Sequence, residues 1–203
     1  MMKNQLTSQD RKRIEEGIRG KYTKVSDSPE GLFQYPTGRA GLEALNYDSE
    51  LIQALPVSAV ASYCGVGNPF TLGVIRKGEA VLDIGCGAGI DTIVAAMMVG
   101  PAGTVAGIDM VPEMLARARE NLRMTDLKNV IFEEAYGEKL PFADGGFDVV
   151  ISNGVFNLIP DKAKALSEVV RVLKPGGRLM MADQILVGEL PSAIKARVAS
   201  WAK

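Results

Sequence analysis

The sequence contains no histidine and only two cysteines, Cys64 and Cys86, among its 203 residues. Without imidazole the chain by itself builds neither a Ser-His nor a Cys-His nucleophile pair, and no histidine general base. A tetrahedral Cys/His zinc site is excluded for the same reason. We therefore predict a chemistry that uses neither imidazole nor a bound metal. A disulfide between the two cysteines stays open at this level, although a reducing compartment disfavours it.

Excess charge and long apolar runs are also missing. Lys and Arg number 23 against 24 Asp and Glu, so the net charge of −1 provides no basic field for nucleic acid or anionic lipid. The N-terminus lacks the apolar core of a signal peptide, and the longest apolar run, 92–99, is too short to span a bilayer. We expect a cytoplasmic protein with a small-molecule partner and no nucleic-acid or membrane partner.

The stretch 80–91 predicts a ligand-binding turn between a strand and a helix. The apolar run 81–84 leads into three glycines, and a helix-compatible run, 92–98, follows. The glycines are Gly85, Gly87 and Gly89. They permit positive φ and let backbone amides and a helix N-terminus approach a ligand closely. A nucleotide-like cofactor is the expected ligand.

The spacing of the acidic residues supports this interpretation. A second apolar run, 104–109, ends in Asp109 about 20 residues after Gly89, where a carboxylate can accept both hydroxyls of a ribose. The glycines follow the pattern G-x-G-x-G, so the G-x-G-x-x-G loop that binds pyrophosphate is not predicted. The alternative is that small residues merely let the helix pack on the strand. Asp83 and Asp91, together with Asp109, favour the cofactor interpretation.

Strands and amphipathic helices alternate through the rest of the chain, which predicts a doubly wound parallel sheet. The later strands are expected at 130–133, 147–152 and 178–183, the later helices at 112–124 and 161–173, and a last helical segment opens at 189–192. In the helix at 161–173, Leu166, Val169, Val170 and Leu173 are predicted to face the sheet. The loops 85–89, 109–110, 135–138 and 153–157 follow the first four strands, so we expect them to form one pocket.

Residues 1–70 are predicted to form an N-terminal helical cap, and residues 71–203 the main domain. A helix is expected at 7–22, with Ile14, Ile18 and Tyr22 on one face, and Asp48 is expected to cap a short helix. The segment 25–41 is either a surface connection or a lid. The Gly-rich turn 64–69 is a candidate pocket wall, in which Cys64 is either a soft thiolate or a buried small residue.

Four motifs, taken as a set, resemble those of class I S-adenosylmethionine-dependent methyltransferases: 81–89, 108–110, 140–148 and 171–178. Within that class, 64–69, 109–114, 152–162 and 189–191 look like the arsenite methyltransferase branch. The resemblance implies a Rossmann-like, doubly wound, mostly parallel sheet. Two more strands normally follow the fifth in this class. We find no pattern for them before Lys203, and therefore expect the chain to lack these strands.

The resemblance implies S-adenosylmethionine as the cofactor and suggests where each part of it binds. Asp109 would hold the ribose, Met110 would flank the adenine, and Asn153 would lie near the methionine end. The remaining cofactor residues are the loop glycines Gly85, Gly87 and Gly89 with Cys86 between them, Asp83 and Asp91 beside the loop, and Gly137 and Glu138 at the adenine edge. Tyr136 stands where many members of the family have Asp.

The implied activity is transfer of a methyl group to a small acceptor, such as arsenite or another small molecule. The family holds trivalent arsenic with cysteines, one of them in the turn that contains Cys64, whereas Gly154 stands where a further cysteine is expected. This favours another acceptor and leaves Cys64 as the single weak catalytic candidate. Positioning can do most of the work, because a sulfonium methyl is already activated.

Three alternatives stay open. One is a non-catalytic or truncated S-adenosylmethionine-binding domain. A second is a nicotinamide-dependent oxidoreductase, which the glycine spacing and the lack of a Tyr-x-x-x-Lys motif disfavour. The third concerns assembly: a homodimer, in which another chain completes the edge of the sheet, is a possible arrangement.

Overall fold

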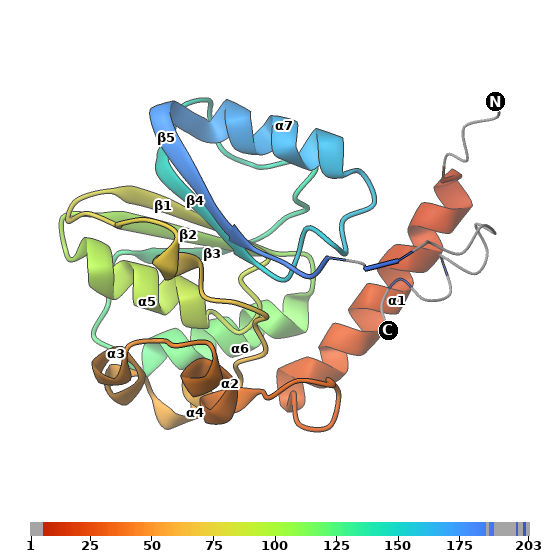
Figure 1. Cartoon of the computed structure of the whole chain (residues 1–203). Coiled ribbons are helices and arrows are strands. Elements are labelled where there is room, and N and C mark those ends of the chain that lie inside the picture. Colours follow the sequence, from red (N-terminus) through yellow and green to blue (C-terminus); the bar gives the residue numbers. More distant parts are fainter. Residues whose placement is uncertain (1–5, 186, 189–197, 199–200, 202–203) are drawn as a thin grey trace.

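The computed structural model describes residues 6–185, 187–188, 198 and 201. Its five strands are parallel and lie in the order β3-β2-β1-β4-β5. They are β1 (Ala80–Ile84), β2 (Thr104–Asp109), β3 (Val130–Glu134), β4 (Phe147–Asn153) and β5 (Leu173–Ala182). Helices α5 (Ile90–Val99) and α6 (Pro112–Arg123) cover one face of the sheet, and α7 (Lys162–Val172) covers the other (Figure 1). The predicted doubly wound, Rossmann-like fold is confirmed.

Alternate residues of β1 face the two helical layers. Leu82 and Ile84 pack in the cluster that contains the buried side of α7, whereas Val81 packs in the cluster beneath α5. Because both faces are covered, the central strands read as continuous apolar runs rather than alternating ones. Each such side chain, fully buried, contributes about 1.5–3 kcal/mol to folding. Asp83 breaks this pattern, because it is a carboxylate only 2% exposed inside an otherwise apolar strand.

The buried face of α7 differs from the prediction. Val169 is buried as expected, whereas Leu166 is 41% exposed and Val170 is 73% exposed. The stripe that meets the sheet is Ala165, Val169 and Val172, at i, i+4 and i+7. The small Ala165 lets the helix approach the sheet closely, which turns Leu166 and Val170 toward solvent. The prediction for those two residues was therefore wrong.

Residues 174–177, whose Lys-Pro-Gly-Gly sequence is typical of a turn, lie inside a strand. β5 begins at Leu173, which pairs with Phe147, and the next ladder pair is Arg178 with Val149. The residues between them form a bulge against β4, with Gly176 at φ +79°. The strand therefore begins five residues before the predicted position 178, because the glycine turn is absorbed into the ladder.

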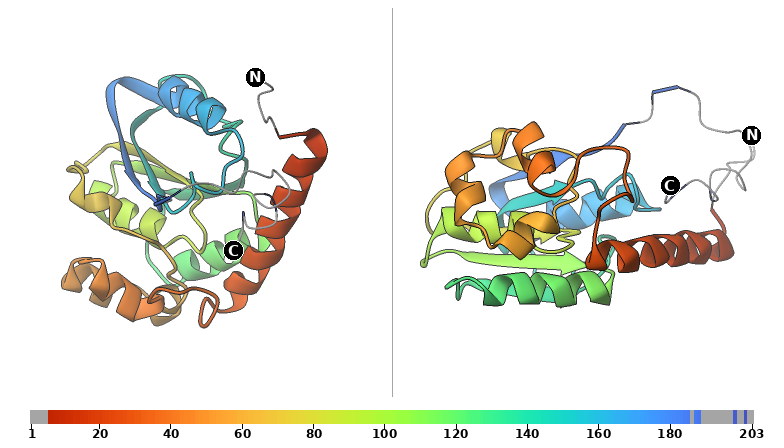
Figure 2. Two further views of the ribbon diagram at one scale, coloured as in Figure 1. Left: turned by 45° about the vertical axis from the view of Figure 1, so that its right-hand side comes forward. Right: turned by 90° about the horizontal axis from the view of Figure 1, so that it is seen from below.

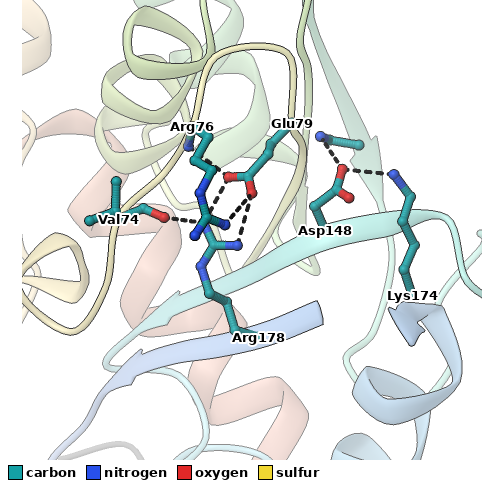
Figure 3. Close-up of polar contacts among 7 residues, drawn as sticks. Val74, Arg76, Glu79, Asp148, Lys174 and Arg178 are labelled. Atoms are coloured by element: carbon teal, nitrogen blue, oxygen red, sulfur yellow. Dashed lines mark hydrogen bonds and ion pairs between the residues drawn. The ribbon is translucent and has the colours of Figure 1, made fainter. Parts of the chain in front are cut away.

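Ion pairs at the amino edge of the sheet fix the segment that precedes β1 (Figure 3). Arg178 donates to both carboxylate oxygens of Glu79, at 2.9 and 2.7 Å, and also to the carbonyl of Val74. Nearby, Asp148 accepts from the amide of Ala80 at 2.8 Å and from Lys174 at 2.7 Å. These contacts tie β1, β4 and β5 together at the end of the sheet opposite to the predicted pocket.

The N-terminal region contains one long helix and three short ones: α1 (Ser8–Asp27), α2 (Gly38–Ala44), α3 (Ser49–Ala54) and α4 (Val57–Ala61), followed by a 3-10 turn, η1 (Pro69–Thr71). Helix α1 exceeds the predicted 7–22 and begins with a capping box between Thr7 and Asp10. Asp48 caps α3 as predicted. Helix α2 was missed, because Gly38 and Gly41 lie in a segment with loop composition.

The short helices pack on the side of the sheet that carries α5 and α6, and α1 lies beyond the carboxyl ends of the strands (Figure 2). Buried residues of α1–α4, such as Val25, Leu42 and Ile52, share one apolar cluster with Ile93 of α5 and Met114 of α6. Among the described residues, no helix is both long and apolar enough to cross a membrane. The helical segment predicted from 189 lies outside the described residues, apart from 198 and 201.

Candidate functional site

A cavity opens at the carboxyl edge of the sheet and encloses about 1100 Å³ of space, its open mouth included. It lies beyond the end of β1, whose two neighbours in the sheet are β2 and β4. The strand order reverses direction at this position, which is the switch point of a doubly wound sheet. All four predicted loops contribute to its lining, so the prediction of a single pocket is confirmed. Helix α1 adds Glu15, Ile18 and Tyr22 to the lining, which the sequence did not indicate.

The three glycines of the 85–89 loop occupy different surroundings. Gly85 has φ +71° and lies on Val155, whose Cγ2 would be 2.3 Å from an added Cβ. Gly87, at φ +52°, lines the cavity. Gly89 lies outside the cavity lining, and an added Cβ there would be 2.8 Å from Phe132 of β3. The first two keep side chains out of the cavity wall, whereas the third permits close packing of helix on strand.

Asp109 ties this glycine loop to the end of β2. One carboxylate oxygen accepts from the Gly87 amide at 2.9 Å, and the other accepts from the Val111 amide at 2.9 Å. Burial raises the pKa of the Asp109 carboxyl to about 6, although its backbone hydrogen bonds act in the opposite direction. Each oxygen retains a further lone pair, so the carboxylate can also accept hydrogen bonds from the hydroxyl groups of a ligand in the cavity. Met110 lines the cavity beside it.

Two further carboxylates lie behind the loop. Asp83 accepts from the Thr92 hydroxyl at 2.6 Å, which fixes the first turn of α5 to β1. Burial and the nearby Asp91 raise the pKa of Asp83 well above its usual range. Asp91 accepts from the Tyr47 hydroxyl at 2.7 Å and from the Asn153 amide at 2.9 Å. Burial raises the pKa of Asp91 to about 6 against these bonds.

Asn153, at the end of β4, is the centre of a hydrogen-bond network that reaches the N-terminal region. Its oxygen accepts from the amides of Val66 and Gly67, and its nitrogen donates to the Gly67 carbonyl and to Asp91. The hydroxyls of Tyr47 and Tyr63 lie 3.2 Å apart in the same network. Sequence reasoning missed both tyrosines, because no motif surrounds them and only the fold brings them to β4.

The residues predicted at the adenine edge lie where α1 meets β3. The Tyr136 hydroxyl accepts from the Arg19 guanidinium at 3.0 Å, and Arg19 also pairs with Glu134 at 3.4 Å. Gly137 lies against Ile159, which would be 2.8 Å from an added Cβ, and Glu138 joins it in the cavity lining. Arg19 therefore connects helix α1, which lines the cavity, to Tyr136 and Glu134 at the end of β3.

Cys64 lines the cavity as a protonated thiol. Burial, together with the charges of Asp109 and Asp91, raises the pKa of this thiol to about 12, so a thiolate is scarce at neutral pH. Cys64 and Cys86 are both free, and Cys86 is buried within the glycine loop. In the part of the chain that the structure describes, no three His, Cys, Asp or Glu side chains form a cluster that could hold a metal ion.

Comparison with known proteins agrees with this geometry. A family model described as a methyltransferase domain matches residues 75–203, well over half of the chain. The chain therefore belongs to the methyltransferase domain family, and its fold and motifs are those of the class I S-adenosylmethionine-dependent type.

Three relatives illustrate the match. An arsenite methyltransferase of Halobacterium salinarum is 41% identical over 159 residues, which cover 78% of this chain and 40% of the relative. A demethylmenaquinone methyltransferase of Listeria welshimeri is 42% identical over 110 residues, covering 54% of this chain and 46% of the relative. The crystal structure of an arsenic(III) S-adenosylmethionine methyltransferase from Chlamydomonas reinhardtii matches at 35% identity with a TM-score of 0.56, covering 73% of this chain and 50% of that one. The chain thus spans less than half the length of these curated relatives.

The residues present fit the cofactor of this family. At Gly85 and Gly87 a side chain would need positive φ, so backbone alone forms that wall of the cavity. Carboxylates of Glu15, Asp91, Asp109 and Glu138 line the cavity, whereas its described lining contains neither lysine nor arginine. Such a wall suits a cationic sulfonium and the hydroxyls of a ribose.

Proposed function

We propose that this chain binds S-adenosylmethionine in the cavity and transfers its methyl group to a small acceptor. The observation that carries the proposal is the contact of Asp109 with the amide of Gly87, at 2.9 Å, at the switch point of the sheet. It brings a carboxylate and a side-chain-free loop to one wall, as a nucleoside with a charged tail requires. In this arrangement Asp109 receives the ribose, Met110 and Gly137 flank the adenine, and Asp91 attracts the methionine ammonium.

The chemistry we infer is one of alignment. The cofactor supplies an activated methyl group, and the chain holds the acceptor in line with it and excludes water. Tyr22, Tyr63 and Cys64 line the cavity wall formed by α1 and the 64–68 turn, which we assign to the acceptor. No histidine is needed for such a transfer, in keeping with the composition of the chain.

For the acceptor we favour a small uncharged molecule whose binding does not depend on a protein thiol. Two of the relatives are named for arsenic methylation, and a thiol-complexed trivalent arsenic species is one such acceptor. Cys64 is a protonated thiol, while Cys86 lies within the cofactor loop, so this chain offers no set of thiolates. We also propose a cytoplasmic setting, which the two free cysteines support, and the homodimer stays a prediction to be tested by solution mass.

Calorimetric titration tests the cofactor assignment directly. We expect S-adenosylmethionine to bind saturably, and Asp109→Ala to weaken the affinity by about a hundredfold, because two charge-assisted hydrogen bonds are lost. Asp126→Ala, at an exposed position, is the matched control and should bind as the unaltered chain does. Binding of NADH in place of S-adenosylmethionine would sink the proposal in favour of an oxidoreductase.

A transfer assay with methyl-labelled cofactor then tests the acceptor. With arsenite and glutathione as the acceptor mixture, we expect Cys64→Ser to retain most of the methylation rate of the unaltered chain. Complete loss of transfer in that variant, with cofactor binding intact, would instead make Cys64 an obligatory ligand of the acceptor.

A further inference from the structure

The turn formed by residues 64–68 is attached to β4 largely through one side chain. The Asn153 oxygen accepts from the amides of Val66 at 2.9 Å and Gly67 at 3.0 Å, and the Asn153 nitrogen donates to the Gly67 carbonyl at 2.8 Å. Three hydrogen bonds from one amide thus determine both the distance and the direction of the turn. A further bond, to Asp91 at 2.9 Å, connects the same side chain to α5, and the hydroxyls of Tyr47 and Tyr63 each lie 3.3 Å from the same nitrogen.

These bonds use the full capacity of the asparagine side chain. A primary amide offers two acceptor lone pairs and two donor hydrogens. The two lone pairs are used by the amides of Val66 and Gly67, and the two hydrogens by the Gly67 carbonyl and Asp91. Little capacity is left for a direct bond to a cofactor, which is the role that the sequence suggested for Asn153.

Steric fit at the turn supports the same interpretation. At Gly65 an added Cβ would be 2.4 Å from the Asn153 nitrogen and 2.5 Å from the Tyr63 hydroxyl. The φ of Gly65 is not in the left-handed region, so the glycine is required there by close approach rather than by backbone conformation. At Gly67 an added Cβ would be 2.5 Å from Ala182 of β5. The turn therefore lies in direct contact with the ends of two strands.

The partners of Asn153 on its far side orient its amide. Asp91 lies in the first turn of α5, directly after the glycine loop, and accepts from both Asn153 and Tyr47. The Tyr63 hydroxyl donates to the Gly67 carbonyl at 3.0 Å, and the Tyr47 oxygen lies 3.3 Å from the same carbonyl oxygen, so both tyrosines border the same gap. The Asp91 carboxylate thus determines the orientation of the Asn153 amide, because only the nitrogen can donate to Asp91.

We propose that Asn153 is a positioning residue that holds the 64–68 turn at a set distance from the glycine loop. Asp91 orients it, and the cavity wall that carries Cys64 is placed through it. The proposal rests on the proposed function only in assigning that wall to the acceptor. Its consequence is that removal of Asn153 disturbs the placement of the turn and of the acceptor, while the affinity for the cofactor is nearly unchanged.

The reactivity of Cys64 toward a chromogenic aromatic disulfide measures the placement of the turn without any enzymatic assay. A thiol kept protonated by burial labels slowly, and labelling accelerates when the turn moves into solvent. The same measurement on Cys64→Ser provides the background from Cys86. For Asn153→Ala we expect labelling of Cys64 to rise about tenfold or more, because several partly buried hydrogen bonds are lost. Calorimetry should show the dissociation constant for S-adenosylmethionine within about threefold of the original.

Gly65→Ala tests the same idea while leaving Asn153 in place. The added methyl group should push the turn away from β4 and raise the labelling rate of Cys64 as Asn153→Ala does. It also keeps the proposal testable if Asn153→Ala does not fold. Asn129→Ala is the matched control, because Asn129 likewise holds a loop through two carbonyls, those of Gly100 and Gly103, at the other edge of the sheet. It should lower stability and leave the labelling of Cys64 unchanged.

A third variant, Asn153→Asp, adds a pH readout that loss of packing alone would not produce. An ionised carboxylate at this position faces Asp91 and the Gly67 carbonyl with acceptors only, whereas its protonated form can donate to Asp91. The ratio of its labelling rate to that of the unaltered chain should therefore rise as the pH increases.

Two results would overturn the proposal. Labelling of Cys64 at the original rate in both Asn153→Ala and Gly65→Ala would show that the turn is held by other contacts. An equal rise in Asn129→Ala would show general loosening of the fold. Failure of the unaltered chain to bind S-adenosylmethionine would instead refute the proposed function. The labelling rates would still test the placement of the 64–68 turn, because they are measured without the cofactor.

Discussion

At the scale of single residues, the glycines of the 85–89 loop serve different purposes although the motif presents them as a set. Gly85 and Gly87 keep one wall of the cavity free of side chains, whereas Gly89 packs against Phe132 and Ala118. The pattern G-x-G-x-G could not distinguish these roles, because the neighbours of each glycine come from strands and helices distant in sequence.

We expect Gly89→Ala to destabilise the fold by about 2–4 kcal/mol. A left-handed φ of +83° costs a non-glycine residue about 1–2 kcal/mol, and overlap with Phe132 at 2.8 Å adds a similar amount. Urea unfolding measures the change. Gly145→Ala is the control, since φ there is +63° but nothing lies within 4 Å, so only the backbone cost applies. Equal losses in both variants would contradict the packing role of Gly89.

Asp109 leads to a prediction about pH. Burial raises the pKa of its carboxyl to about 6, so the free protein is mostly protonated at this group at pH 5. The ionised form is the better acceptor of a hydrogen bond from a ribose hydroxyl, so we expect protonation of Asp109 by itself to weaken S-adenosylmethionine binding about tenfold at pH 5 relative to pH 7.5. Calorimetry at the two pH values measures this. In Asp109→Asn the ratio should fall toward the contribution of Asp91, and an unchanged ratio would show that Asp109 does not titrate.

The same shift acts on stability with a definite sign. A folded-state pKa above the unfolded value of about 3.9 means that the folded chain binds the proton more tightly between about pH 4 and pH 6. The contribution of Asp109 to the free energy of unfolding therefore falls as the pH rises through this window, and it stays lower above it. Above about pH 6 the ionised Asp109 therefore lowers the stability of the ligand-free protein, at the position where the proposed cofactor would favour the ionised carboxylate.

At the scale of elements, α7 shows why an amphipathic helix can be found in a sequence while its buried face is misjudged. Leu166 and Val170 are larger and more hydrophobic than Ala165, so the sequence pattern predicted that they face the sheet. The helix instead buries Ala165 with Val169 and Val172, because a small residue at the centre of the contact permits close packing on the sheet. Hydrophobicity alone does not select between two faces of similar apolar content.

The neighbouring pair Val169 and Val170 tests this orientation of α7. Val169→Ala should lower the free energy of unfolding by about 2 kcal/mol, because it opens a void between helix and sheet. Val170→Ala should change it by less than about 0.5 kcal/mol, since this side chain is 73% exposed. Chemical denaturation of both variants under one set of conditions is the measurement, and similar losses in the two variants would restore the face predicted from the sequence, which included both valines.

At the scale of the whole molecule, the N-terminal helix and the sheet together form the cavity. Ile18 and Tyr22 line it from α1, and Arg19 connects α1 to Glu134 and Tyr136 at the end of β3. The predicted domain boundary at residue 70 stays a prediction. The helices α2–α4 before it share an apolar cluster with α5 and α6 after it. The side chains that α1 contributes to the cavity lining support a cap role for this helix.

If α1 caps the cofactor, Arg19→Ala should accelerate its release. Loss of the bonds to Tyr136 and Glu134 removes about 1 kcal/mol from the closed arrangement, since both contacts are partly exposed, so we expect S-adenosylhomocysteine to dissociate about threefold to tenfold faster. Stopped-flow displacement measures the rate. Arg39→Ala, which removes an exposed pair with Glu43 on α2, is the control. Equal rates in both variants would exclude a cap fastened through Arg19.

Much of the fold and part of the site followed from the sequence, because local patterns carry them. Strands buried on both faces read as continuous apolar runs, and a glycine turn after β1 with an acid after β2 marks a ligand site in any parallel sheet. The meeting of four loops in one cavity followed from the parallel arrangement of the strands, because the loops after their carboxyl ends lie at the same edge of the sheet. The start of β5 was misplaced because a bulge and a turn use the same glycine-rich composition.

What the sequence by itself determined is therefore the α/β architecture, the family motifs and the position of the glycine loop after the first strand, all of which depend on neighbours within about 20 residues. Only the tertiary structure decided how Tyr47 and Tyr63 reach Asn153, how Arg19 meets Tyr136, and which face of α7 is buried. The reason is physical. These contacts join segments distant along the chain, and their geometry depends on how closely helices and turns pack on the sheet.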